Sequence, residues 1–117
     1  MVETAIVILA GTESHSDLGR LVNGLQAAKE FQDAGDEIEV IFDGAGTQWI
    51  PELEDEDHDY HALYDALSEN VTACDYCADA FRVGDEVDDS EADRVAEFEG
   101  HPSVRDLVAE GYEVITY

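Results

Sequence analysis

Apolar runs and amphipathic segments alternate along the first half of the chain. Residues 4–10 form a continuous apolar run, which is typical of a parallel strand covered on both faces. Apolar residues then recur at helical spacing over 18–31 and predict a helix, which Ser16 or Asp17 can cap. Residues 37–42 alternate at first and are then wholly apolar, so they predict a second strand near the border of a sheet.

The second half of the chain continues this alternation with shorter elements. We expect a helix after the cysteines that reaches Val83 and ends at Gly84, followed by a loop or frayed helix over 85–93. Residues 94–99 fit either a helix or an edge strand. The remaining predictions are a tight turn over 43–47, a short helix over 49–53, an acidic surface loop over 52–59, a helix over 61–68, a third strand near Val71, a helix over 102–110 and a final strand over 112–117.

This order of elements predicts the fold class. Strands and helices alternate without an internal repeat, which indicates an α/β fold with a mostly parallel sheet between two layers of helices. The length of 117 residues suits a single domain over residues 1–117, with a core of its own.

The charge is far from that of an ordinary domain. Asp and Glu number 30 against 5 Lys and Arg, so the formal net charge is -25. Acidic residues occur in almost every segment, which favours adaptation to a very salty cytosol over a dedicated acidic face for one cationic partner. The chain lacks a basic patch to neutralise phosphates, so binding of DNA or RNA through a basic surface is excluded.

Both cysteines of the protein, Cys74 and Cys77, stand where a short apolar run meets a predicted helix start. Parallel α/β sheets place reactive groups at such junctions, since strand ends open onto a crevice and helix N–H groups point into it. We find no signal peptide and no stretch long enough to span a membrane, so we expect a cytoplasmic protein without membrane contact. In that compartment a Cys-x-x-Cys pair is more often redox-active or metal-binding than a structural disulfide.

Several segments together resemble the DsrE-like family, small α/β proteins associated with sulfur relay. They are Ile-Phe-Asp-Gly-Ala-Gly-Thr at 41–47 with Trp49 beyond, Cys-Asp-Tyr-Cys-Ala at 74–78, and Gly-Tyr-Glu-Val at 111–114. The resemblance spans nearly the whole chain. It implies about five parallel strands, with 94–99 as the fourth, and homo-oligomers, here a trimer or hexamer. It also implies a cysteine after the third strand that carries persulfide sulfur between partner proteins. Cys74 and Cys77 match that place, and Cys74 is the stronger candidate.

Three hypotheses for the cysteine pair stay open. One is a sulfur-carrier or redox thiol, with the second thiol resolving the product. Another is a tetrahedral zinc site that combines Cys74 and Cys77 with His58 and His61. The third is a pair of thiols that only pack at the edge of the sheet. His15 follows the first strand and could face the same crevice as a proton donor or thiolate partner.

We therefore predict a catalytic set of Cys74, Cys77 and His15, with no cofactor. Besides other copies of the chain, we expect donor or acceptor proteins for sulfur as partners. The substrate-binding candidates come from the loops after the first two strands and from the Cys-x-x-Cys segment: Gly11, Thr12, Asp43, Gly44, Gly46, Trp49 and Tyr76.

Overall fold

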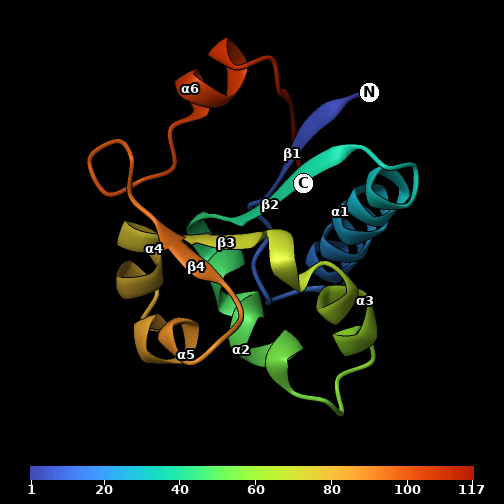
Figure 1. The fold of residues 1–117 in the computed structure, drawn as a ribbon. Coiled ribbons are helices and arrows are strands. Elements are labelled where there is room, and N and C mark those ends of the chain that lie inside the picture. Colours follow the sequence, from blue (N-terminus) through green and yellow to red (C-terminus); the bar gives the residue numbers. More distant parts are fainter.

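A computed structural model describes residues 1–117 and contains one five-stranded sheet. All strands are parallel, and their order across the sheet is β4-β3-β2-β1-β5 (Figure 1). The α/β fold expected from the alternating elements is confirmed. The strands are β1 (Glu3–Ile8), β2 (Glu37–Phe42), β3 (Val71–Cys74), β4 (Asp93–Val95) and β5 (Glu113–Thr116).

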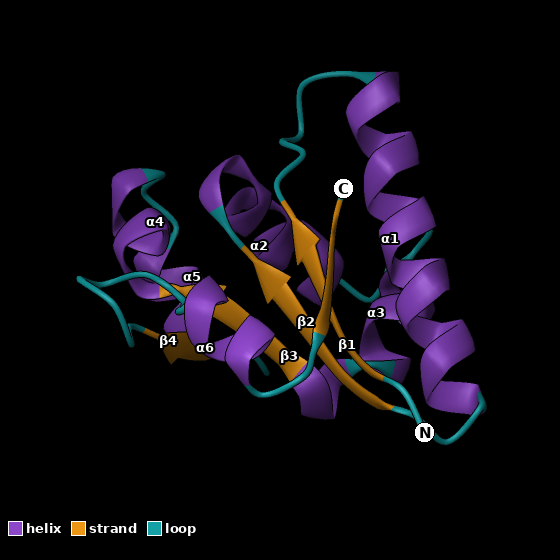
Figure 2. Cartoon of the chain, turned by 90° about the horizontal axis from the view of Figure 1, so that it is seen from above, coloured by secondary structure: helices purple, strands orange, loops and turns teal.

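Helices cover both faces of the sheet, but unequally (Figures 1 and 2). One face carries α1 (His15–Asp33), α2 (Trp49–Glu54), α3 (His61–Ala66) and α5 (Gly84–Asp88), while the other is covered by α6 (Val104–Ala109). The remaining elements are α4 (Asp75–Ala80), which follows β3 directly, and the 3₁₀ turns η1 (Gly44–Gln48) and η2 (Ser68–Asn70). No helix combines the length and the apolar composition needed to cross a membrane.

The buried side chains follow this asymmetry. The larger core cluster has 19 residues, most of which come from the strands and from the helices on the α1 side of the sheet. Phe42 and Tyr64 are among its largest members. The smaller cluster has four residues, Ala5, Val7, Ile41 and Leu107, and lies under α6. Residues of β1 belong to both clusters, as expected for a strand whose two faces are covered.

Two predictions in the acidic segment after the cysteines were wrong. The helix ends at Ala80 rather than Val83, because Arg82 adopts the left-handed region with φ 63° and breaks it. Gly84 begins α5 instead of ending a helix. A Cβ at Gly84 would lie 2.5 Å from Oδ1 of Asp79, so glycine lets the chain double back closely against α4.

The fourth strand exists but is shorter than 94–99. It ends at Val95, and the following residues leave the sheet to form a tight turn, in which Phe98 and His101 exchange two backbone hydrogen bonds of 2.9 Å. The turn positions Glu99 and Gly100 both have positive φ, 52° and 86°, as in the type I′ turns of hairpins. This turn matters for the site, because it carries His101.

Candidate functional site

The register of the sheet brings Asp43 and Cys74 together. Phe42 of β2 is paired with Ala73 of β3, so the next residue on each strand, Asp43 or Cys74, lies at the same carboxyl edge. In a parallel α/β sheet this edge is where ligands and reactive groups gather.

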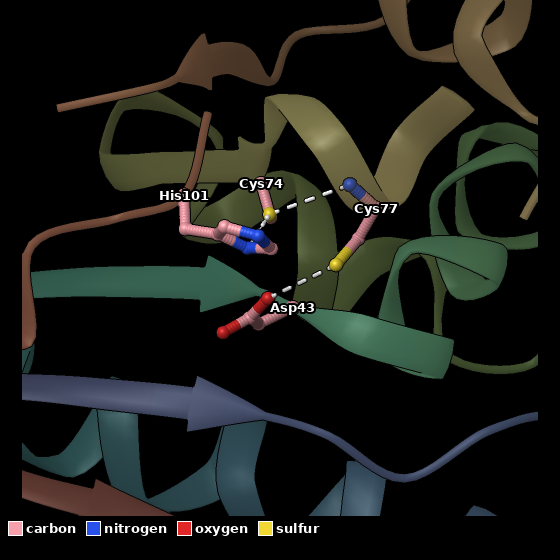
Figure 3. Close-up of side chains that lie close together, drawn as sticks. All are labelled: Asp43, Cys74, Cys77 and His101. Atoms are coloured by element: carbon pink, nitrogen blue, oxygen red, sulfur yellow. Dashed lines mark hydrogen bonds between the residues drawn. The ribbon is translucent and has the colours of Figure 1, made fainter. Parts of the chain in front are cut away.

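The start of α4 then adds the second thiol. Cys74 is the N-cap of this helix, and its Sγ accepts a hydrogen bond from the backbone N–H of Cys77 at 3.4 Å. One helical turn separates the two cysteines, which turns both side chains to the same end of the helix. The thiol of Cys77 donates to Oδ1 of Asp43, with 3.5 Å between sulfur and oxygen (Figure 3).

His101 reaches the same place from the 98–101 turn. The N–H of Tyr76 donates to the carbonyl of Gly100 at 2.9 Å, which fixes the turn against the first turn of α4. Nδ1 of His101 consequently lies 3.3 Å from Sγ of Cys74 (Figure 3), and the ring of Tyr76 lies 4.9 Å from the imidazole. The carbonyl of Gly100, 3.7 Å from the same sulfur, is a second acceptor for the thiol proton.

Asp43, Cys74, Cys77 and His101 thus form one cluster of chemically active groups. One donor atom from each residue can be chosen so that all four lie within 4.8 Å of one another. Both cysteines are free thiols and both are buried, Cys74 fully and Cys77 with 8% of its surface exposed.

Burial controls the protonation of Cys74. Loss of water raises the pKa of its thiol to about 12, and neighbouring Cys77 and Asp43 add to that rise. The hydrogen bond from the N–H of Cys77 acts in the opposite direction but is the weaker influence. At neutral pH the resting site therefore holds a thiol at position 74, and a nucleophilic sulfur requires a base that takes its proton.

Arg94 of β4 anchors the helix that carries the pair. Its guanidinium donates to the side chains of Asp75, Asp79 and Asp88 at 2.7–3.2 Å, and to the backbone carbonyls of Asp75 and Gly84 at 3.2 Å. These bonds raise the pKa of Arg94 still further, the Asp88 carboxylate being the main cause, so the cation is permanent. One side chain thereby joins β4, α4 and α5.

Of the residues selected from the sequence, two join the cysteines. Asp43 bonds Cys77, and Tyr76 lies at the surface beside His101 with 59% of its area exposed. Gly44 lies next to them, and its N–H donates to Oδ1 of Asp43 at 2.8 Å.

The other selected residues lie elsewhere or serve packing. A Cβ at Gly46 would lie 2.0 Å from the carbonyl oxygen of Ile8, so this glycine permits contact between η1 and β1. Trp49 is buried and its Nε1–H donates to the carbonyl of Ala10 at 2.9 Å. Gly11 lines a hollow at the carboxyl ends of β1 and β5, whereas Thr12 and His15 line another beside Trp49 and His58.

The histidines chosen for a zinc site do not join the thiols. Nδ1 of His61 lies 2.7 Å from the carbonyl oxygen of Leu53, and the ring of His58 packs on Trp49 and accepts from the N–H of Tyr60. The cluster of possible ligands around the thiols contains Asp43 and His101 in their place. His101 was missed because the acidic segment before it obscures the end of β4. The available signal was that Gly100 and Pro102 flank it, since glycine and proline mark turns.

Comparisons with known proteins agree with this architecture. The model of the DsrE/DsrF-like family matches residues 5–117. An uncharacterized protein of Methanocaldococcus jannaschii is 25% identical over 95 residues, which cover 81% of this chain and 78% of that protein. A solved structure of a conserved protein of unknown function from Bacteroides thetaiotaomicron superimposes with a TM-score of 0.60 at 14% identity, over 97% of this chain and 94% of that one.

The fold and the site define a small three-layer α/β protein with a paired-thiol centre at the carboxyl edge of its sheet. The chain belongs to the DsrE/DsrF-like family, and this membership supports a role of the sulfur-relay type.

Proposed function

We propose that the protein carries sulfur as a persulfide on Cys74, with His101 as the proton acceptor and Cys77 as the second thiol. The observation that carries this proposal is the 3.3 Å approach of Nδ1 of His101 to Sγ of Cys74. A buried thiol with a raised pKa is a poor nucleophile alone, and a neighbouring imidazole is the side chain suited to activate it.

The loading step is a transfer of one sulfur atom. His101 takes the proton of the Cys74 thiol, and the thiolate attacks the outer sulfur of a donor persulfide, R–S–SH. A bond forms between Sγ of Cys74 and that sulfur, while the donor's S–S bond breaks. The donor leaves as R–S⁻ and recovers a proton from the imidazolium, so the products are Cys74–S–SH and R–SH without net oxidation.

The persulfide can be discharged in two ways, one of which uses Cys77. An acceptor thiol can take the outer sulfur, or the thiolate of Cys77 can attack Sγ of Cys74, forming a disulfide and releasing hydrosulfide. In the resting protein the Cys77 thiol donates a hydrogen bond to Asp43, and this bond must break before Cys77 can attack as a thiolate. This favours delivery to an acceptor over premature closure of the disulfide.

Cys74 is fully buried and His101 of the 98–101 turn contacts its sulfur, so we propose that this turn moves aside to admit a donor. Phe98 at the start of this turn and Tyr76 beside His101 are exposed by 62% and 59% and give a donor or acceptor protein an apolar surface. We place this exchange in the cytoplasm and in a homo-oligomer, a trimer or a hexamer. Light scattering in molar salt that returns a monomer mass at every concentration would refute the oligomer.

The test of the carrier is intact mass after incubation with a sulfane-sulfur donor, under non-reducing conditions. The wild type should gain the mass of one sulfur atom and lose it with dithiothreitol. Cys74→Ser should gain none, while Cys77→Ser should load and retain its sulfur longer for want of the second thiol. Equal loading of wild type and Cys74→Ser would refute the carrier role of Cys74.

A further inference from the structure

The four groups at the carboxyl edge also have the composition of a metal site. Two sulfurs, one imidazole nitrogen and one carboxylate oxygen are a donor set that Zn²⁺ accepts in four-coordinate sites. They come from three separate segments: Asp43 follows β2, the cysteines begin α4, and His101 lies in the 98–101 turn.

The distances between the donors are close to those of a tetrahedral ion. Bonds of about 2.3 Å to sulfur and 2.0–2.1 Å to nitrogen or oxygen place a sulfur about 3.6 Å from either of the lighter atoms at the tetrahedral angle. The structure has 3.3 Å between Sγ of Cys74 and Nδ1 of His101, and 3.5 Å between Sγ of Cys77 and Oδ1 of Asp43. Small shifts of side chains would complete the tetrahedron, since all four donor atoms lie within 4.8 Å of one another.

Neighbouring groups hold these donors in position. The N–H of Gly44 binds the carboxylate of Asp43, and the N–H of Cys77 binds the sulfur of Cys74. The ring of Tyr76 packs against His101. Such contacts around the ligands orient them and strengthen binding in metal sites.

We propose that Asp43, Cys74, Cys77 and His101 bind a thiophilic divalent cation, with Zn²⁺ the best match to the donors. Each thiol gives up its proton when it becomes a ligand, so two protons are released for each ion bound. Metal binding is a second activity of these four residues, and it does not depend on whether Cys74 carries sulfur. It shares both thiols with the carrier, so a bound ion excludes the persulfide.

The test is a titration of the reduced, sulfur-free full chain with Co²⁺, a coloured substitute for Zn²⁺, in molar KCl. The salt suppresses loose association of cations with the acidic surface. Binding at the thiols should give a thiolate-to-cobalt charge-transfer band in the near ultraviolet and the intense visible bands of tetrahedral cobalt, saturating at one ion per chain. Zn²⁺ should displace the colour.

Variants identify the ligands. His101→Ala and Asp43→Asn should each weaken cobalt binding by about 100-fold. Loss of a residue that only orients a metal ligand already weakens binding by about 10- to 100-fold, and these two residues are ligands themselves. Asparagine retains an oxygen acceptor for the N–H of Gly44 but removes the negative charge. His58→Ala is the matched control, because that histidine packs on Trp49 outside the cluster, and it should bind like the wild type.

Absence of the charge-transfer band from the wild type would overturn the metal site. So would wild-type affinity in both His101→Ala and Asp43→Asn, or an equal loss in His58→Ala. Circular dichroism of each variant shows whether the fold is intact. The sulfur-loading experiment tests the carrier function separately. A protein that does not bind cobalt can still load sulfur, and a protein that binds cobalt can fail to load sulfur.

Discussion

Arg94 is the side chain whose removal should loosen the site from a distance. We consider Arg94→Met, which keeps much of the apolar stem and removes the guanidinium. The change eliminates bonds to the backbone carbonyls of Asp75 and Gly84 and leaves the carboxylates of Asp75, Asp79 and Asp88 facing one another without a cation.

The magnitude follows mainly from the backbone contacts. A hydrogen bond from a charged group contributes about 1.5 kcal/mol or more to stability, so two lost carbonyl contacts cost about 3 kcal/mol. The ion pairs add little, since the carboxylate side chains are 40–68% exposed and such pairs are weak. For a domain of this size, a loss of about 3 kcal/mol lowers the melting temperature by roughly 12 °C.

The assay is thermal unfolding followed by circular dichroism in molar KCl. Arg105→Met is the matched control, because this side chain is 85% exposed and bonds only its neighbour Asp106. It should change the melting temperature by no more than about 2 °C. Because α4 carries Cys77, Arg94→Met should also speed alkylation of the thiols. A melting temperature for Arg94→Met equal to that of Arg105→Met would refute the role of Arg94 as the anchor of α4.

Three further predictions concern charge and protonation. Glu39 has a raised pKa from burial and from nearby Glu97 and Glu110, so its ionised form destabilises the native state. Glu39→Gln should raise the melting temperature at pH 7, and this gain should vanish as pH falls below 4.5, the ordinary pKa of a glutamate; a gain that is independent of pH would contradict it. In Cys77→Ser, the alkylation rate of Cys74 should still rise above about pH 10, where a thiol with the ordinary pKa of 9.0 has levelled off; a plateau near pH 10 would contradict the raised pKa. Salt should raise the melting temperature steeply up to about 0.5 M by screening the net charge of -25, then more slowly and further with sulfate; a flat profile would contradict halophilic adaptation.

Much of the fold could be predicted because the first strand is a continuous apolar run and the second ends in one. The range 37–42 coincides with β2, and the junction at Cys74 follows from a short apolar run meeting a helix start. Asp43 could also be expected at the site, because it follows the neighbouring strand. These features depend on local pattern and on the parallel arrangement, both of which are visible in the chain.

The histidine at the site could not be predicted, because its position depends on backbone geometry within an acidic segment. Glu99 adopts positive φ, which is uncommon for residues other than glycine, and the resulting turn folds His101 back over Cys74. The expected partner, His15, follows β1 by seven residues and begins α1 instead of staying at the strand's end. Sequence spacing alone could not distinguish these two histidines.

In the proposed function, Cys74 bears the transferred sulfur and His101 accepts the proton of its thiol. Fragmentation mass spectrometry of the sulfur-loaded wild type, alkylated to protect the persulfide, tests it most directly, because it assigns the extra sulfur to one of the two cysteines. We predict the additional sulfur on Cys74 in the wild type, and much slower loading of the same residue in His101→Ala. Additional sulfur found on Cys77 alone, or on neither cysteine after incubation with the donor, would contradict the claim.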